Sequence, residues 1–200
     1  QETGNLFGES IPTFNLSRAA LRLGKNQEAL QYSQEAVEIS RGLQSSRLGQ
    51  HLCSLGAAYA SLGQLDKAIA ALEEGLSLKS MAKTGLLDME LREAYAAILM
   101  TQQNYGAALP LVEEILPTLH SEVLDSADDP FLIYLTCYHV LQANQDERAM
   151  PLLHQAYQAL LAKAQQIKDP DFHRSFLENV PHHRQLIEVY EASQGRPVHE

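Results

Sequence analysis

Residues 52–75 carry the clearest pattern in the chain: they read Leu52-x2-Leu55-Gly56-x2-Tyr59 and continue with Gly63, Ala68, Leu72 and Gly75. The apolar residues on either side of Gly63 recur at the spacing of an amphipathic helix. A glycine between two such stretches favours a tight turn, because glycine readily adopts the left-handed conformation that ends many helices. The segment therefore predicts two helices packed as a hairpin.

The pattern returns in three further stretches of the chain. A small residue recurs in the same register at Ala29, Ala68, Ala108 and Ala149, with separations of 39, 40 and 41 residues. The expected turns follow the same period, at Leu23-Gly24-Lys25, Leu62-Gly63-Gln64, Gln102-Gln103-Asn104 and Ala143-Asn144-Gln145. Glycine and asparagine are expected to take the left-handed position in these turns. Self-similarity at a fixed period indicates a repeat architecture.

These spacings resemble the tetratricopeptide repeat (TPR) family, whose ordinary repeat is 34 residues long, with about six residues added to each unit here. The resemblance implies an all-α fold, a right-handed superhelical stack of antiparallel helix pairs. We expect a poorly ordered or remnant segment at 1–9, capping helices and a tail at 169–200, and between them four hairpins at about 10–48, 49–88, 89–129 and 130–168.

Small residues and prolines refine this prediction. Gly56 and Ala68 are expected where the two helices of a unit cross closely, because larger side chains would hold the backbones apart. Pro110 and Pro151 stand two residues beyond Ala108 and Ala149, and proline in a helix interior costs about 3 kcal/mol. The second helices of units three and four should therefore begin close before these prolines, near 105–119 and 146–168.

The C-terminal part of the chain shows several helix starts. Asp128 or Asp129 can cap a helix with Pro130 in its first position. A short helix is expected at 171–178 and a last one from Pro181 to about Ser193. The segment 172–184 is similar to those that end TPR arrays in large bacterial signalling proteins, behind an ATPase or cyclase domain. The resemblance implies a bacterial, cytoplasmic, multidomain parent.

Charge and composition exclude several classes of function. The 200 residues carry a formal net charge of −10, from 15 basic and 25 acidic residues, which disfavours nucleic-acid binding. No apolar run reaches the length of a membrane span. Cys53 and Cys137 lie 84 residues apart without a CxxC motif, and we expect them to be reduced thiols.

Neither a metal site nor a cofactor site is expected. The chain has no HExxH motif and no Cys/His quartet. His182 and His183 are adjacent, so in a helix their side chains should point about 100° apart. The carboxylates of Asp169 and Asp171 are expected to cap a helix. The remaining scattered histidines should lie at surface or edge positions, namely His51, His120, His139 and His154.

Catalysis is also disfavoured. There is no GxSxG motif, and the recurring pairs Glu73-Glu74 and Glu113-Glu114 are expected on a solvated helix face. A hydrolase that uses the region from His173 to His183 is the least favoured hypothesis.

The resemblance places a binding groove along the first helix of each unit. The matching positions are Phe14, Arg18, Gln50, Cys53, Ala57, Glu90, Glu93, Ala97, Met100, Phe131, Tyr134, Tyr138 and Leu141. Glu90 and Glu93 would make the middle acidic and repel the peptide carboxylate that some TPR proteins bind. A peptide or helix with apolar anchors and a basic residue fits better. Alternatively, Phe131, Tyr134 and Tyr138 pack against the capping helix 182–193.

The functional prediction is a non-catalytic protein–protein interaction scaffold or sensor in a larger bacterial regulatory protein. The alternative is a small-ligand- or peptide-responsive switch that controls an attached ATPase, cyclase or transcriptional effector. Weak self-association through exposed array ends is also expected.

Overall fold

The computed structural model describes residues 3–78, 85–119, 124, 127 and 129–195. Every regular element in these ranges is helical, which confirms the all-α prediction. The chain divides into two compact units, Gln1–Gln103 and Asn104–Glu200. The division falls in the turn of the third predicted hairpin.

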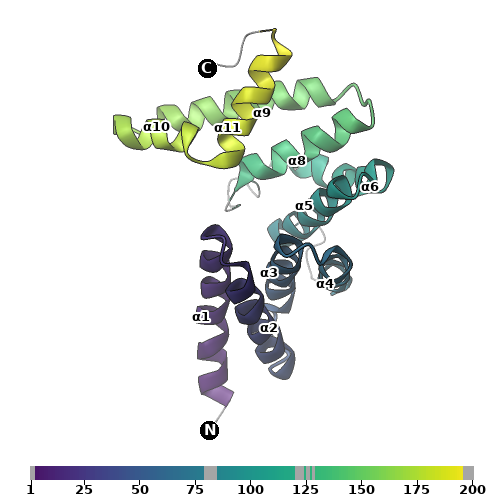
Figure 1. Cartoon of the computed structure of the whole chain (residues 1–200), viewed down its shortest axis with the longest axis vertical. Helices are drawn as coiled ribbons and strands as arrows, with labels where there is room; N and C mark the ends of the chain where they lie inside the picture. Colours follow the sequence, from purple (N-terminus) through teal and green to yellow (C-terminus); the bar gives the residue numbers. More distant parts are fainter. Residues whose placement is uncertain (1–2, 79–84, 120–123, 125–126, 128, 196–200) are drawn as a thin grey trace. The chain divides into compact units, whose positions relative to one another are not determined.

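The first unit consists of consecutive helices packed in antiparallel pairs (Figure 1). α1 pairs with α2 and α3 with α4, while α2 also packs on α3 and α4 on α5. The first helix begins seven residues before the expected start of the first hairpin and continues through Pro12. The bounds are α1 Thr3–Arg22, α2 Asn26–Gly42, α3 Leu48–Ser61, α4 Leu65–Ser77 and α5 Leu86–Thr101.

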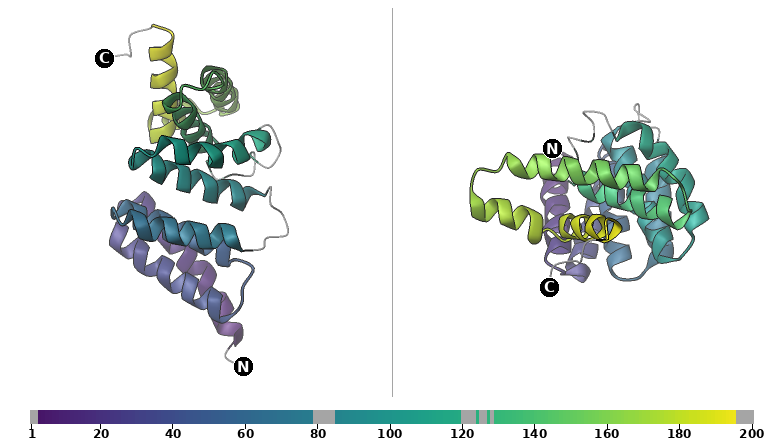
Figure 2. Two further views of the ribbon diagram at one scale, coloured as in Figure 1. Left: turned by 90° about the vertical axis from the view of Figure 1, so that its right-hand side faces the viewer. Right: turned by 90° about the horizontal axis from the view of Figure 1, so that it is seen from above.

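The second unit contains the remaining hairpin and the capping helices. α6 packs on α8, and α8 pairs with α9. The chain then reverses, so that α10 runs back beside α9 and α11 contacts both α8 and α9 (Figure 2). The bounds are α6 Tyr105–Ile115, the 3-10 turn η1 Leu116–Thr118, α8 Pro130–Ala143, α9 Ala149–Gln165, α10 Pro170–Glu178 and α11 Pro181–Ser193.

The hairpin turns lie where the sequence places them. Gly24 and Gly63 have φ angles of 70° and 71°, and the two later turns have Gln103 at 58° and Gln145 at 57°. The expectation that asparagine takes the left-handed position was therefore wrong. Asn144 instead has φ −90°, and its side-chain amide donates to the carbonyl of Tyr105 at 2.9 Å, which joins its turn to the start of α6.

The close crossing inside the second hairpin is confirmed. A Cβ atom added to Gly56 would lie 2.8 Å from Cγ and Cδ2 of Leu72 and 3.4 Å from the carbonyl oxygen of Ala68. Ala68 and Leu72 are completely buried. The backbone of α3 therefore approaches α4 at a distance that no other residue type than glycine permits without displacement.

The two helices that contain these prolines begin at or near the expected positions, at Tyr105 and Ala149, but only one of the prolines lies in the first turn. Pro151 is the third residue of α9, where its missing N–H leaves no intrahelical bond unmade. Pro110 is the sixth residue of α6, so one intrahelical bond is lost there. Asp129 caps α8 by accepting a hydrogen bond from the Leu132 N–H at 3.2 Å; the alternative cap, Asp128, lies outside the described residues.

Polar contacts join successive hairpins within each unit. In the first unit, the amide of Asn26 donates to the carbonyl of Ser61 at 3.1 Å, and Arg41 pairs with Glu74 at 2.5 Å. In the second unit, Arg148 of the last turn before α9 pairs with Glu113 of α6. Glu113 is exposed and Glu74 is partly exposed, as expected for a solvated helix face, and each of them also forms an ion pair with a residue of another segment.

Candidate functional site

The strongest candidate surface lies on the first helices of the N-terminal hairpins, because α3 packs between α1 and α5. Three sets of predicted groove residues occur there at the i, i+3, i+4 and i+7 spacings that share one helix face. Those that are partly exposed define what we call the α1–α3–α5 face: Arg18, Gln50, Cys53, Ala57, Glu90, Ala97 and Met100.

Charged groups of α1 and α5 lie on this face, on either side of the uncharged residues of α3. Arg18 of α1 lies 5.6 Å from the ring centroid of Phe14, a cation–π arrangement. Burial raises the pKa of the Glu90 carboxyl on α5, and the positive charge of Arg18 partly opposes that rise. The ionised form of Glu90 is therefore under-solvated, and an approaching cation would stabilise it.

Cys53 of α3 lies in the middle of the face. Burial raises the pKa of its thiol to about 12, with further contributions from the carboxylates of Glu90 and Glu93, while Arg18 lowers it. A thiol with so high a pKa remains protonated at neutral pH and is a poor nucleophile. Neither cysteine forms a disulfide in the structure, and the position of Cys53 favours a packing role at the face.

Some predicted groove residues are not on an exposed surface. Phe14 and Glu93 are each only 9% exposed. The ring of Phe14 packs against the imidazole of His51, with 5.2 Å between their centroids. These two residues support the face from below, so a partner would contact mainly Arg18, Glu90 and their partly exposed neighbours.

The aromatic residues of α8 are buried within the second unit. Phe131, Tyr134 and Tyr138 are 6%, 5% and 2% exposed, and Leu141 is fully buried. The ring of Phe131 meets that of His183 edge-on, at a centroid distance of 5.0 Å, so Phe131 packs beneath the cap. The Tyr134 hydroxyl donates to the carbonyl of Leu119 at 2.9 Å. These side chains therefore do not form a surface for a partner.

The histidines differ from the expectation in two places. His51 is buried rather than peripheral; its Nδ1 lies 2.6 Å from Ser40 Oγ, and burial lowers its pKa. His182 and His183, expected to diverge, instead lie with their ring centroids 4.7 Å apart, beside Asp129. His139 is partly exposed and His154 is exposed, as expected, whereas His120 lies outside the described residues.

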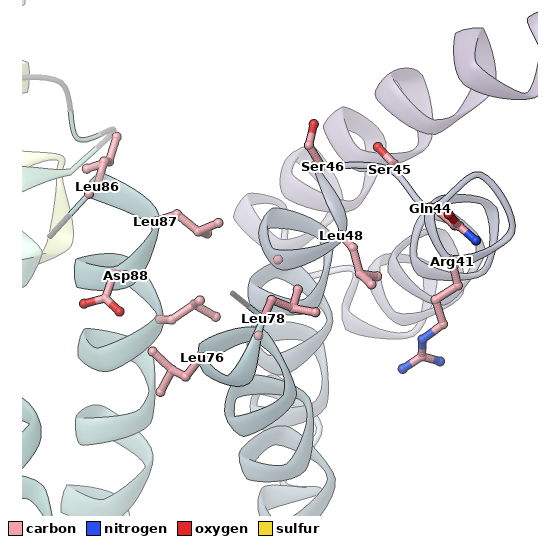
Figure 3. Close-up of a pocket in the computed structure, with 14 residues that line it drawn as sticks. Arg41, Gln44, Ser45, Ser46, Leu48, Leu76, Leu78, Leu86, Leu87 and Asp88 are labelled. Carbon is pink, nitrogen blue, oxygen red and sulfur yellow. The ribbon is translucent and has the colours of Figure 1, made fainter. Parts of the chain in front are cut away.

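A cavity of about 740 Å³ lies on a different side of the first unit. Figure 3 shows Leu87 projecting from the start of α5 toward Leu78, while Leu48 comes from the start of α3. Further lining comes from Leu76, Leu86 and Leu91, with Arg41 and Asp88 as charged members. Asp88 is ion-paired with Arg92 at 2.7 Å, so the cavity is mainly apolar. The sequence did not predict this cavity, because it depends on how four helices and a turn meet.

Part of the sequence is similar to a known repeat family. The family model for the tetratricopeptide repeat matches residues 9–80. No curated protein has a sequence similar enough to count as a relative. Among the helices that the structure describes, none combines the length and the hydropathy that a membrane span requires.

Solved structures agree with the fold. The chain is similar to the nearly identical TPR-like repeats of a Podosopora anserina protein assigned as a kinesin light chain: identity is 18%, coverage 94% of this chain and 96% of that one, and the TM-score 0.62. A point variant of the same repeats gives 18% identity, coverage of 98% and 97%, and a TM-score of 0.63. The MamA RS-1 ArsTM double mutant gives 19%, 93% and 96%, and 0.52.

Proposed function

We propose that the chain is a non-catalytic binding module whose α1–α3–α5 face takes a peptide or helix of a partner protein. The match of residues 9–80 to the tetratricopeptide repeat model and the TPR-like fold of the chain support this proposal. TPR repeats generally mediate protein–protein interaction, and repeat folds of this kind present extended binding surfaces. The observation that carries the proposal is that the partly exposed residues Arg18, Cys53 and Glu90 lie on three first helices, α1, α3 and α5, of which α3 packs against both others.

The acidic side chain of Glu90 on this face favours a partner that carries a basic residue. Glu90 is partly buried and its pKa is raised by that burial. A lysine or arginine side chain placed against it would offset the cost of burying the carboxylate. Ala57, Ala97 and Met100 are partly exposed on the same helix faces and offer apolar contact to the same partner. The chain is thus proposed to bind a basic segment with apolar anchors, within a larger bacterial regulatory protein.

A peptide-library selection against the full chain tests this proposal. We expect selected peptides to be enriched in Lys and Arg beside apolar residues, and their affinity to fall as salt concentration rises. Glu90→Gln should weaken binding by roughly five- to tenfold, the effect of losing a partly desolvated charge pair.

The matched control is Glu35→Gln, which removes the same charge from an exposed position on α2. Its effect should stay below about twofold, as expected for a distant screened charge. Selection of acidic peptides, or equal losses in the two variants, would contradict the proposed face.

The cavity between α3, α4 and α5 supports a second candidate function, the binding of a small ligand that switches an attached effector. Its volume of about 740 Å³ falls in the range of about 300–1,000 Å³ that is common for small-molecule sites. Its leucine lining suits an apolar molecule rather than a charged metabolite.

Nile red binding measures this second function directly. We expect Leu78→Trp, which fills the cavity, to weaken binding of the dye at least tenfold, since the wall it contacts would be occupied. Leu23→Trp is the control, because Leu23 is 72% exposed and does not line the cavity. Thermal melts of both variants show whether the fold is kept. If both bind the dye as the unmodified chain does, the cavity is not a ligand site.

A further inference from the structure

The second unit brings two adjacent histidines and an aspartate together at the base of the cap. Asp129 is the N-cap of α8, while His182 and His183 are the second and third residues of α11. One ligand-type atom of each residue lies within 4.8 Å of those of the other two. The cluster thus joins two helices whose starts are more than fifty residues apart in the chain (Figure 1).

The imidazole rings converge rather than diverge. Their centroids are 4.7 Å apart and their planes are perpendicular, although neighbouring residues in a helix leave it about 100° apart. The convergence is enforced from the His183 side, where the ring is wedged edge-on against Phe131 at 5.0 Å and packs on Phe176 at 4.4 Å.

A hydrogen bond to the backbone fixes the tautomer of His183 and leaves one ring nitrogen able to bind a metal ion. Its Nδ1 lies 2.7 Å from the carbonyl oxygen of Phe176, so Nδ1 carries the proton and donates it to that oxygen. The lone pair of the neutral ring then resides on Nε2. A backbone carbonyl that accepts from one ring nitrogen is the usual outer contact of a metal-binding histidine, because it fixes both the tautomer and the ring orientation.

The second histidine, His182, has a buried ring nitrogen, Nε2, that lacks a well-directed hydrogen bond within the described part of the chain. His182 Nε2 lies 2.7 Å from Asp129 Oδ1, but it has no well-directed hydrogen-bond partner among the described residues. A short distance with poor direction leaves a buried lone pair or proton unsatisfied, which costs stability. Asp129 Oδ1 also accepts from the Leu132 N–H, and a carboxylate has a second oxygen to offer to an ion.

We propose that Asp129, His182 and His183 form a binding site for a divalent transition-metal ion such as Zn²⁺. Two imidazole nitrogens and one carboxylate oxygen suit Zn²⁺, Ni²⁺ and Cu²⁺, whereas Mg²⁺ and Ca²⁺ require mostly oxygen ligands. Three protein ligands leave a fourth position of a tetrahedral ion for water. The bound ion would join the start of α8 to the start of α11 and hold the cap on the second unit.

Zinc titration of the full chain, prepared without a histidine tag, tests this site. We expect calorimetry to show one Zn²⁺ per chain, and Co²⁺ in the same position to give the visible absorption of a tetrahedral complex. Asp129→Asn and His182→Gln should each weaken Zn²⁺ binding at least tenfold, because each removes a direct ligand. Asparagine remains a good N-cap, so Asp129→Asn separates ligation from folding.

His173→Gln is the matched control, since His173 is a partly exposed residue of α10 outside the cluster; it should bind Zn²⁺ as the unmodified chain does. Absence of zinc binding in the unmodified chain would overturn the proposal. So would unchanged affinity in Asp129→Asn and His182→Gln, or displacement of Zn²⁺ by an equal concentration of Mg²⁺. Retained melting temperatures in the two variants show that any loss is one of ligation.

Discussion

Gly56→Val is expected to destabilise the first unit by about 3 kcal/mol, at the upper end of the cost of overpacking a core. A Cβ at this position would already lie 2.8 Å from two atoms of Leu72. Leu72 is completely buried, so it has no open space into which it can turn. The branched side chain of valine would therefore push α3 away from α4 along their whole contact.

Chemical denaturation followed by circular dichroism measures this effect, with Gly42→Val as the matched control. Gly42 is the last residue of α2, and a Cβ added there meets nothing within 4 Å. The control should change the free energy of unfolding by less than about 0.5 kcal/mol, because valine and glycine differ little in helix propensity. Equal effects in the two variants would show that α3 and α4 do not cross closely at Gly56.

Phe131→Ala is expected to destabilise the second unit by about 3–5 kcal/mol, the usual cost of removing a buried phenylalanine ring. Phe131 is 6% exposed and meets Phe176 of α10 and His183 of α11 edge-on, at 6.3 and 5.0 Å. Truncation removes one aromatic contact to each capping helix at once. Hydrogen exchange should therefore accelerate throughout α10 and α11, along with the fall in unfolding free energy.

Phe172→Ala is the control for this substitution, because it removes the same ring from a position on α10 that is 71% exposed. Its cost should remain within about 0.5 kcal/mol, as for other surface changes. If Phe131 lined an open groove instead, the two variants would have similar stability. The comparison therefore decides between the two roles that the sequence left open for Phe131.

Only part of the candidate surface could be predicted from the sequence. The spacing of Gln50, Cys53 and Ala57 on one helix face follows from the helical period, and these residues are indeed partly exposed. Glu93 lies on a predicted groove position too, yet it is 9% exposed. Periodicity assigns a residue to a face but does not say how closely the neighbouring helix covers it.

The hairpins themselves were determined by local information. The turns at Gly24 and Gly63 need a left-handed residue, the crossing at Gly56 needs a small one, and the helix start at Asp129 needs a cap. Each requirement is met within one hairpin, so the amino-acid types reveal it directly. The repeat strengthens the prediction of hairpins, because the same requirements return about every 40 residues.

Tertiary structure alone decided how distant segments meet. The burial of Phe131 under His183, the convergence of Asp129 with His182, and the cavity beside Leu87 each join residues from separate helices. Such contacts depend on how the side chains of different helices pack together. The repeat period carries no information about this packing. The repeat sequence therefore specifies the hairpins, while the packing of α10 and α11 on α8 creates the chemistry of the cap.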